Sequence, residues 1–263
     1  MTKKAKLILW HGLVMVVAVA LWFDVAAWLK VVSVEGDFAS YAVVFFALLV
    51  SLVGLGFVMF PVKRWALTFS LLIWGMFVVN FGWSYLYLIG LGILILAALR
   101  SVADVKGEVS ERIKIKSRVI LRRAVLPIIL GLFVLTSFAA YESPAFDKFR
   151  NMDSLPGETE GYIKTVVENT IGRNIKVRNE TERRSVIDQV SKETTRELNT
   201  FLSPYFKYAP PVLAFALFLI LWGLSWVFIW ISVGVGTFVF WILKRSGFIK
   251  IEERDTRAEI LII

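Results

Sequence analysis

Long runs of apolar residues dominate this chain and leave it few ways to fold. Residues 40–60 contain no charged side chain, and comparable runs occupy five further segments: 7–29, 65–81, 83–99, 124–141 and 210–243. Each is long enough for a helix to cross the ~30 Å hydrocarbon core of a bilayer, which takes about 17 residues or more. Because hydrocarbon offers the backbone no hydrogen-bond partner, such segments cross as helices. The sequence therefore predicts an all-α integral membrane protein built as a six-span helical bundle.

A short interruption separates the third run from the fourth. As a single helix, residues 65–99 would be about 52 Å long at ~1.5 Å per residue, too long for one crossing. Asn80 and Gly82 lie near the midpoint, and both residue types favour turns. We expect a tight hairpin between the two spans.

The basic residues gather in every second connection between the runs. The N-terminal tail, residues 61–64, residues 100–123 and the C-terminal tail together hold 18 basic and 7 acidic residues, a net charge of +11. The connection 24–39 carries −2, and residues 142–207 are neutral. Because basic loops remain on the cytoplasmic side of a membrane, we expect a cytoplasmic (inner) membrane protein with both termini in the cytosol.

The charge distribution also bears on partners. The predicted cytosolic side accounts for the whole net charge of +9, and anionic lipid headgroups attract basic residues there. We expect the lipid bilayer and those headgroups as partners, and no nucleic acid. A Lys-rich start followed by Ala18-Val19-Ala20 also fits a cleaved signal peptide, but Leu21-Trp22-Phe23 continue the apolar run. We therefore interpret residues 1–141 as five spans of the bundle.

Residues 142–207 form the one sizeable polar region on the predicted outer side. We expect a helical extracytoplasmic domain there, with helices over about 158–171 and 180–202. Two short amphipathic helices bury little core alone, so they should dock on each other, on the membrane-facing ends or on a protein partner. Apolar side chains recur at helical spacing in the second helix and form a candidate contact face: Val186, Ile187, Val190, Leu198 and Phe201.

The last apolar run is too long for one simple crossing and contains no polar turn that would make it two. Two crossings would also place Lys244 and Arg245 outside, against the charge pattern. We predict one long final membrane helix over 208–245. It either extends out of the membrane or breaks at Gly234-Val235-Gly236 into a span and an interfacial helix.

The expected cytosolic parts are a basic loop over 100–123 and a tail over 246–263. In the tail, residues 248–252 alternate and residues 258–262 are apolar, which predicts a small cytosolic β-hairpin. Residues 112–116 also alternate and would extend it to a three-stranded sheet. A disordered basic loop lying on anionic lipid is the alternative.

Few residues in this chain are suited to chemistry. It has no cysteine and a single histidine, so cysteine-based metal sites and thiol nucleophiles are excluded, and we expect no metal or other cofactor. His11 and Ser84 are predicted at opposite faces of the membrane, too far apart for a serine protease. Ion-coupled transporters typically carry an ionisable residue near the middle of the membrane. The predicted spans lack one, which argues against that class.

One face of the final helix carries a row of large rings. Trp222, Trp226 and Trp230 recur every four residues. Such a row can bind a lipid or a partner helix, and packing inside the bundle is the alternative. We keep the row as a candidate lipid or partner face.

Small side chains recur at positions that let helices approach closely. Ala47, Ser51 and Gly54 share one face of the second span, and Ser232 and Gly236 are one turn apart in the last. Small residues at such spacing are typical of helix contacts in membranes. We expect close packing at both places.

No motif in the sequence indicates a particular enzymatic reaction, so we expect a non-enzymatic protein. The leading hypothesis is a scaffold, assembly or sensing component that presents residues 142–207 to a partner. The alternative is a channel or facilitator for small or amphipathic solutes, including lipid. A membrane enzyme that uses the outer carboxylates Asp153, Glu158 and Glu168 is the third, and it requires a cleft that gathers them.

Overall fold

In a computed structural model of the protein, residues 2–30, 39–111, 116–143, 146, 157–170 and 180–249 are described. Regular structure within them is helical throughout, with no strand. The helices are α1 (Lys3–Lys30), α2 (Ala39–Met59), α3 (Lys63–Phe81), α4 (Tyr85–Glu111), α5 (Ser117–Tyr141), α7 (Gly157–Thr170), α8 (Glu180–Leu202), the 3₁₀ helix η1 (Ser203–Tyr208), α9 (Ala209–Gly223) and α10 (Ser225–Arg245). They form two compact units: a bundle unit of residues 1–140 and 214–263, and a hairpin unit of residues 141–213.

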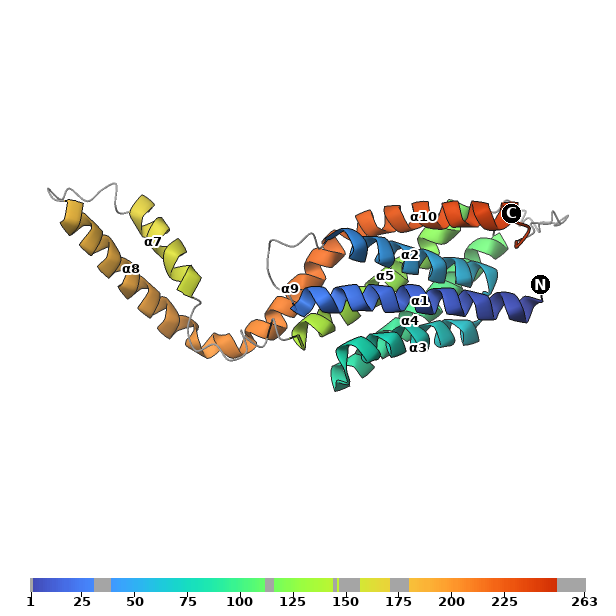
Figure 1. Ribbon diagram of the computed structural model, residues 1–263, viewed down its shortest axis with the longest axis horizontal. Helices are drawn as coiled ribbons and strands as arrows, with labels where there is room; N and C mark the ends of the chain where they lie inside the picture. Colours follow the sequence, from blue (N-terminus) through green and yellow to red (C-terminus); the bar gives the residue numbers. More distant parts are fainter. Residues whose placement is uncertain are drawn as a thin grey trace, which may run out of the picture. The chain divides into compact units, whose positions relative to one another are not determined.

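Helices long and apolar enough to cross a membrane make up most of the bundle unit. The described chain has seven such stretches, of which six are α1–α5 and α10 (Figure 1). The seventh covers residues 184–223. Its apolar part is mainly α9, whose 15 residues would extend about 22 Å, short of the ~30 Å core. The chain therefore has the makeup of a helical membrane protein.

The turn predicted between the third and fourth runs is confirmed. α3 ends at Phe81 and α4 begins at Tyr85. Between them, Gly82 has a φ of +83°, in the region that favours glycine, and its N–H donates to the carbonyl of Val78 at 2.8 Å. The positive φ reverses the chain without steric cost and brings α4 back along α3.

Three tryptophans tie neighbouring helices of the bundle together. Each donates its indole N–H to a backbone carbonyl of another helix: Trp10 to Leu52 at 2.9 Å, Trp22 to Ile73 at 3.2 Å and Trp74 to Tyr87 at 2.8 Å. These bonds join α1 to α2, α1 to α3 and α3 to α4. Trp10 is only 2% exposed and serves packing.

The close packing expected at the small residues of α2 and α10 is present, and the structure shows that the two sets contact each other. The Ser51 hydroxyl donates to the backbone carbonyl of Ser232 at 2.7 Å. A Cβ added at Gly236 would lie 3.6 Å from the Cβ of Ser51, and one added at Gly54 would lie 2.9 Å from the side chain of Val125. The missing side chains let α10 and α5 approach α2 closely.

The segment expected as a basic loop over 100–123 is mostly helical instead. α4 continues to Glu111 and α5 begins at Ser117. Contacts between the two helices stabilise this extension, including a bond from the Ser101 hydroxyl to the carbonyl of Ala124 at 2.7 Å. Residues 112–115, which would carry most of the third strand, and residues 250–263, which would carry most of the β-hairpin, lie outside the described residues.

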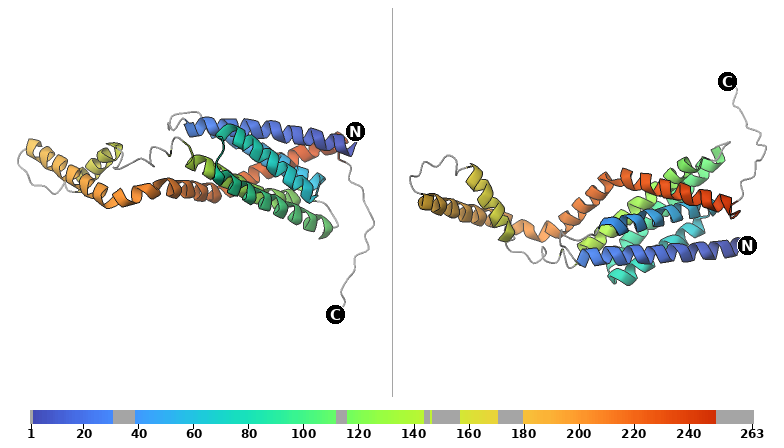
Figure 2. Two further views of the ribbon diagram at one scale, coloured as in Figure 1. Left: turned by 90° about the horizontal axis from the view of Figure 1, so that it is seen from below. Right: turned by 45° about the horizontal axis from the view of Figure 1, so that its top comes forward.

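In place of one long final helix over 208–245, the structure has two. α9 and α10 are separated at Leu224, and the bend between them is visible in Figure 2. Gly234-Val235-Gly236, where a break was considered, lies inside α10 and is helical. A Cβ added at Gly236 would lie 3.3 Å from Leu121. The glycine at this position therefore allows close packing and does not break the helix.

Candidate functional site

An open groove runs along the bundle unit between α5 and the α9–α10 segment. Two pockets of about 360 Å³ and 290 Å³ form it, and Ile229 lines both. We call it the tryptophan groove and define it by seven of its lining residues: Arg118, Arg122, Leu126 and Leu130 of α5, and Trp222, Trp226 and Trp230 of α9 and α10. It combines a basic end on α5 with apolar walls.

Helical periodicity explains how the groove acquires its two walls. The four α5 residues are spaced by four and therefore share a face. Trp222, Trp226 and Trp230 have the same spacing, and their exposed fractions are 54%, 62% and 73%. The alternative that these rings pack inside the bundle is therefore excluded, and they remain available to lipid or to a partner.

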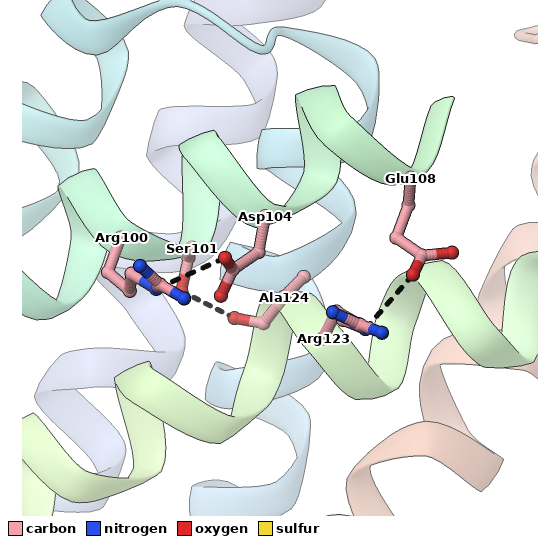
Figure 3. Close-up of polar contacts among 6 residues, drawn as sticks. All are labelled: Arg100, Ser101, Asp104, Glu108, Arg123 and Ala124. Carbon is pink, nitrogen blue, oxygen red and sulfur yellow. Dashed lines mark hydrogen bonds and ion pairs between the residues drawn. The ribbon is translucent and has the colours of Figure 1, made fainter. Parts of the chain in front are cut away.

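Ion pairs neutralise the charges that lie between α4 and α5. Arg100 Nε lies 3.1 Å from a carboxylate oxygen of Asp104, and Arg123 Nε lies 3.0 Å from one of Glu108 (Figure 3). Glu108 is 6% exposed, and a buried carboxylate needs such a partner. Arg100 and Asp104, which line one end of the 360 Å³ pocket, together add no net charge to it.

The other two arginines of α5 lie deeper in the bundle than a loop would place them. Leu121, between Arg118 and Arg122, lies 3.8 Å from a Cβ position at Gly54 of α2 and 3.3 Å from one at Gly236 of α10. Gly54 precedes the end of α2 by five residues, or about 8 Å. Charged side chains at that level need a counter-charge or must extend toward the membrane surface.

Groups suited to catalysis do not gather in the described residues. Among them, no set of three or more histidine, aspartate or glutamate side chains is placed to hold a metal ion. The ring of His11 is engaged, with Nε2 3.0 Å from the Thr68 hydroxyl and Nδ1 2.9 Å from a backbone carbonyl. Of the outer carboxylates, Glu168 is exposed on α7, whereas Asp153 and the Glu158 side chain lie outside the described residues.

In the hairpin unit, α7 packs along α8 (Figure 2). The two helices match those predicted over about 158–171 and 180–202. Their buried seam is lined by Val167, Ile187, Ser191 and Thr195. Lys164 Nζ also donates to a carboxylate oxygen of Asp188 at 2.6 Å. This hydrogen bond, reinforced by the opposite charges, raises the pKa of Lys164 and lowers the pKa of Asp188.

The predicted contact face of α8 is divided between the seam and the surface. Ile187 is 2% exposed in the seam, and Val190 is half-buried. Val186, Leu198 and Phe201 are exposed, Phe201 by 68%. These three side chains are therefore free to meet a partner, whereas Ile187 holds the hairpin together.

Two seam residues were missed because they are polar. The Ser191 hydroxyl donates to the carbonyl of Ile187 at 2.7 Å, and the Thr195 hydroxyl donates to the carbonyl of Ser191 at 2.8 Å. Each hydroxyl is satisfied by its own helix, which removes most of the cost of burying it. Their spacing of four and eight residues from Ile187 is the sequence signal that could have identified them.

No match to this chain was found among protein-family models, curated proteins or solved structures. Within the described residues, the tryptophan groove and the exposed face of the α7–α8 hairpin offer candidate functional surfaces. The groove combines arginine and tryptophan side chains, and the hairpin face carries exposed apolar side chains. The chemistry of each surface supports a hypothesis about what it binds.

Proposed function

We propose that the protein is a non-enzymatic membrane component that presents the α7–α8 hairpin to a protein partner, as a scaffold, assembly or sensing subunit. The observation that supports this is the apolar surface left after the hairpin closes. Tyr162 and Val166 occupy adjacent turns of α7 and are 75% and 63% exposed. Phe201 adds a third large exposed side chain on α8.

The small size of the hairpin strengthens the case for a partner. Its helices α7 and α8 have 14 and 23 residues. The hairpin unit of residues 141–213 is built on the seam between these two helices, and units below about 70–80 residues rarely gain more than about 3–5 kcal/mol from a single core. The chain has no cysteine, and the described residues contain no metal-binding cluster. Association through the exposed apolar side chains would supply what the seam alone does not.

Photo-crosslinking in intact membranes tests this proposal. A photoreactive amino acid at Val166 is expected to form a defined adduct with one protein, because the apolar face is the contact. The same group at Glu168, exposed on the opposite side of α7, is the matched control and should not form the adduct. Adding Tyr162→Ser should reduce the Val166 adduct at least fivefold. Equal adducts from both positions would contradict a specific partner face.

We further propose six crossings, with both termini in the cytosol and the hairpin outside. The Lys6 ammonium donates to the carbonyl of Phe248 at 2.5 Å and lies over its ring. Because α1 begins and α10 ends at the same end of the bundle, an even number of crossings is supported. The neutral hairpin and the basic connections agree with this orientation.

Cysteine labelling tests the orientation, since the chain has no cysteine of its own. In intact cells, a membrane-impermeant maleimide is expected to label Glu160→Cys on α7. Lys63→Cys, exposed at the start of α3, should be labelled only after permeabilisation. Labelling of Lys63→Cys but not of Glu160→Cys in intact cells would reverse the proposed topology.

The packing of the bundle unit supports the alternative function, a channel or facilitator, less well. A water path needs a line of available polar groups, but the buried hydroxyls of Ser51, Ser70, Ser101 and Ser137 each donate to a backbone carbonyl. Among the described side chains, only those of Asp24 and Ser232 keep a buried polar atom without a hydrogen-bond partner. Large apolar side chains, including Trp22, fill the space around them. We therefore favour a packed bundle that anchors the hairpin.

A further inference from the structure

We propose that the tryptophan groove binds one anionic phospholipid of the surrounding bilayer, with its phosphate at Arg118 and Arg122 and its acyl chains along the apolar wall. This site is independent of the α7–α8 hairpin and of any partner that the hairpin meets. The groove lies within the bundle unit, and its volume, charges and side chains all bear on the occupant.

The positive charges of Arg118 and Arg122 at the basic end of the groove favour binding of an anion. Arg100 and Arg123 have carboxylate partners at 3.1 Å and 3.0 Å. In contrast, Arg118 and Arg122 form no ion pair with any residue that the structure describes, and both are exposed. They lie one turn apart on the same face, so two guanidinium groups point toward one pocket.

A phosphate is the anion that this arrangement suits best. Guanidinium groups bind phosphate through paired N–H donors, which makes arginine the preferred residue for such contacts. Trp226 and Trp230 line the same 290 Å³ pocket. Their rings are apolar with one polar edge, a combination that favours the level of lipid headgroups.

The rest of the groove has the length and chemistry of an acyl-chain site. From Arg122, the wall continues through Leu126 and Leu130 to Phe133, with Trp222 opposite. Eleven residues of helix extend about 16 Å, close to half of the ~30 Å hydrocarbon core, which is one leaflet. A lipid whose headgroup lies at Arg118 and Arg122 would therefore keep its chains beside mainly apolar side chains, with the Arg100–Asp104 ion pair as the charged exception.

A phospholipid fits this site better than a partner helix does. A partner helix would have to supply a carboxylate at the level of Leu121, below the ends of the neighbouring helices, where burying a charge is costly. The bilayer supplies phosphates at its surface, and the long arginine side chains can extend toward them. Anionic phospholipid is thus the occupant to which we commit.

Quenching of tryptophan fluorescence by brominated lipids tests the site in the full-length protein. The purified chain is reconstituted in phosphatidylcholine containing an increasing fraction of lipid with brominated acyl chains. The brominated lipid is either phosphatidylglycerol or phosphatidylcholine. We expect the anionic lipid to reach half-maximal quenching at about a tenfold lower fraction, since each basic residue near a bilayer surface adds to the attraction. Trp222→Leu, which removes the ring beside the proposed acyl chains, should remove most of this preferential quenching.

Matched charge changes separate the site from general attraction to a basic surface. Arg118→Gln with Arg122→Gln should abolish the preference for phosphatidylglycerol. Lys63→Gln with Arg64→Gln removes two exposed charges at the start of α3, outside the groove, and should leave the preference unchanged. Arg118→Lys with Arg122→Lys keeps the charge but loses the paired donors, so an intermediate preference is expected.

Several results would overturn the proposal. Equal quenching by the two brominated lipids in the unaltered protein would show that no anionic lipid is selected. Equal loss of preference in both Gln pairs would show diffuse surface attraction instead of a site. Quenching that falls as the protein-to-lipid ratio rises, whatever the headgroup, would show that a second copy of the chain covers the groove.

Discussion

Replacing Gly56 with alanine is expected to lower the unfolding temperature of the purified protein by about 5 °C, which corresponds to about 2 kcal/mol for a bundle of this size. A Cβ at Gly56 would lie 2.9 Å from Trp10 Nε1 and 3.1 Å from the ring of Phe69. Both neighbours are rigid rings in the core of the bundle, so neither can yield without disturbing its own packing.

The same methyl group would displace the hydrogen bond that joins α1 to α2. Trp10 Nε1 donates to the carbonyl of Leu52 at 2.9 Å, and it reaches that carbonyl because position 56 has no side chain. Moving the indole would leave its N–H without a partner in an apolar interior, which costs free energy in addition to the overlap.

Thermal unfolding in detergent, followed by near-ultraviolet circular dichroism, measures the effect of Gly56→Ala. Gly92→Ala is the matched control, because a Cβ at Gly92 of α4 would have no atom within 4 Å. That variant should equal or exceed the unaltered protein, since alanine favours helix. If both variants unfold at the same temperature, the close approach of Trp10 to α2 is refuted.

Replacing Ile187 with aspartate is expected to unfold the hairpin unit while the bundle unit stays folded. Ile187 is 2% exposed between α7 and α8, and an unpaired carboxylate there would lose its hydration. Removing a buried isoleucine side chain alone costs about 2–5 kcal/mol. A small unit rarely has more than about 3–5 kcal/mol of stability, so little or none would remain.

Limited trypsin digestion of the reconstituted protein follows this unfolding. Cleavage after Arg184, Lys192 and Arg196 should accelerate at least tenfold in Ile187→Asp, because opened helices are the substrates of proteases. The neighbouring change Val186→Asp places the same charge at a side chain that is 37% exposed and should change cleavage by less than twofold. Similar acceleration in both variants would contradict the packing of α7 on Ile187.

Features that depend on neighbouring residues in the chain were predictable from sequence. The apolar runs became helices α1 to α5 and α10, and Asn80 and Gly82 marked the turn between α3 and α4. In these cases hydropathy and backbone preference act locally, and each run needs no information about its neighbours to form a helix. The two hairpin helices were predictable for the same reason.

Features that depend on contacts between helices were not predictable in the same way. The charged stretch 100–111 looked like a loop because hydropathy ignores the bond from Ser101 to Ala124 and the pairing of Arg123 with Glu108. The break at Leu224 carries no proline, and the flanking Gly223 and Ser225 are a weak turn signal within an apolar run. The tryptophan row was recognised, but its basic wall was not, because Arg118 and Arg122 meet it only in three dimensions.

The contact between α2 and α10 has a consequence for how the protein is made. The hydrogen bond from Ser51 to Ser232 joins residues 181 positions apart, and synthesis proceeds from the N-terminus. While α3, α4 and α5 are being synthesised, the face of α2 that carries Ser51 has no α10 against it. α10 therefore reaches α2 only after the intervening helices have been made, and until then the Ser51 hydroxyl can donate only within α2, to the carbonyl of Ala47.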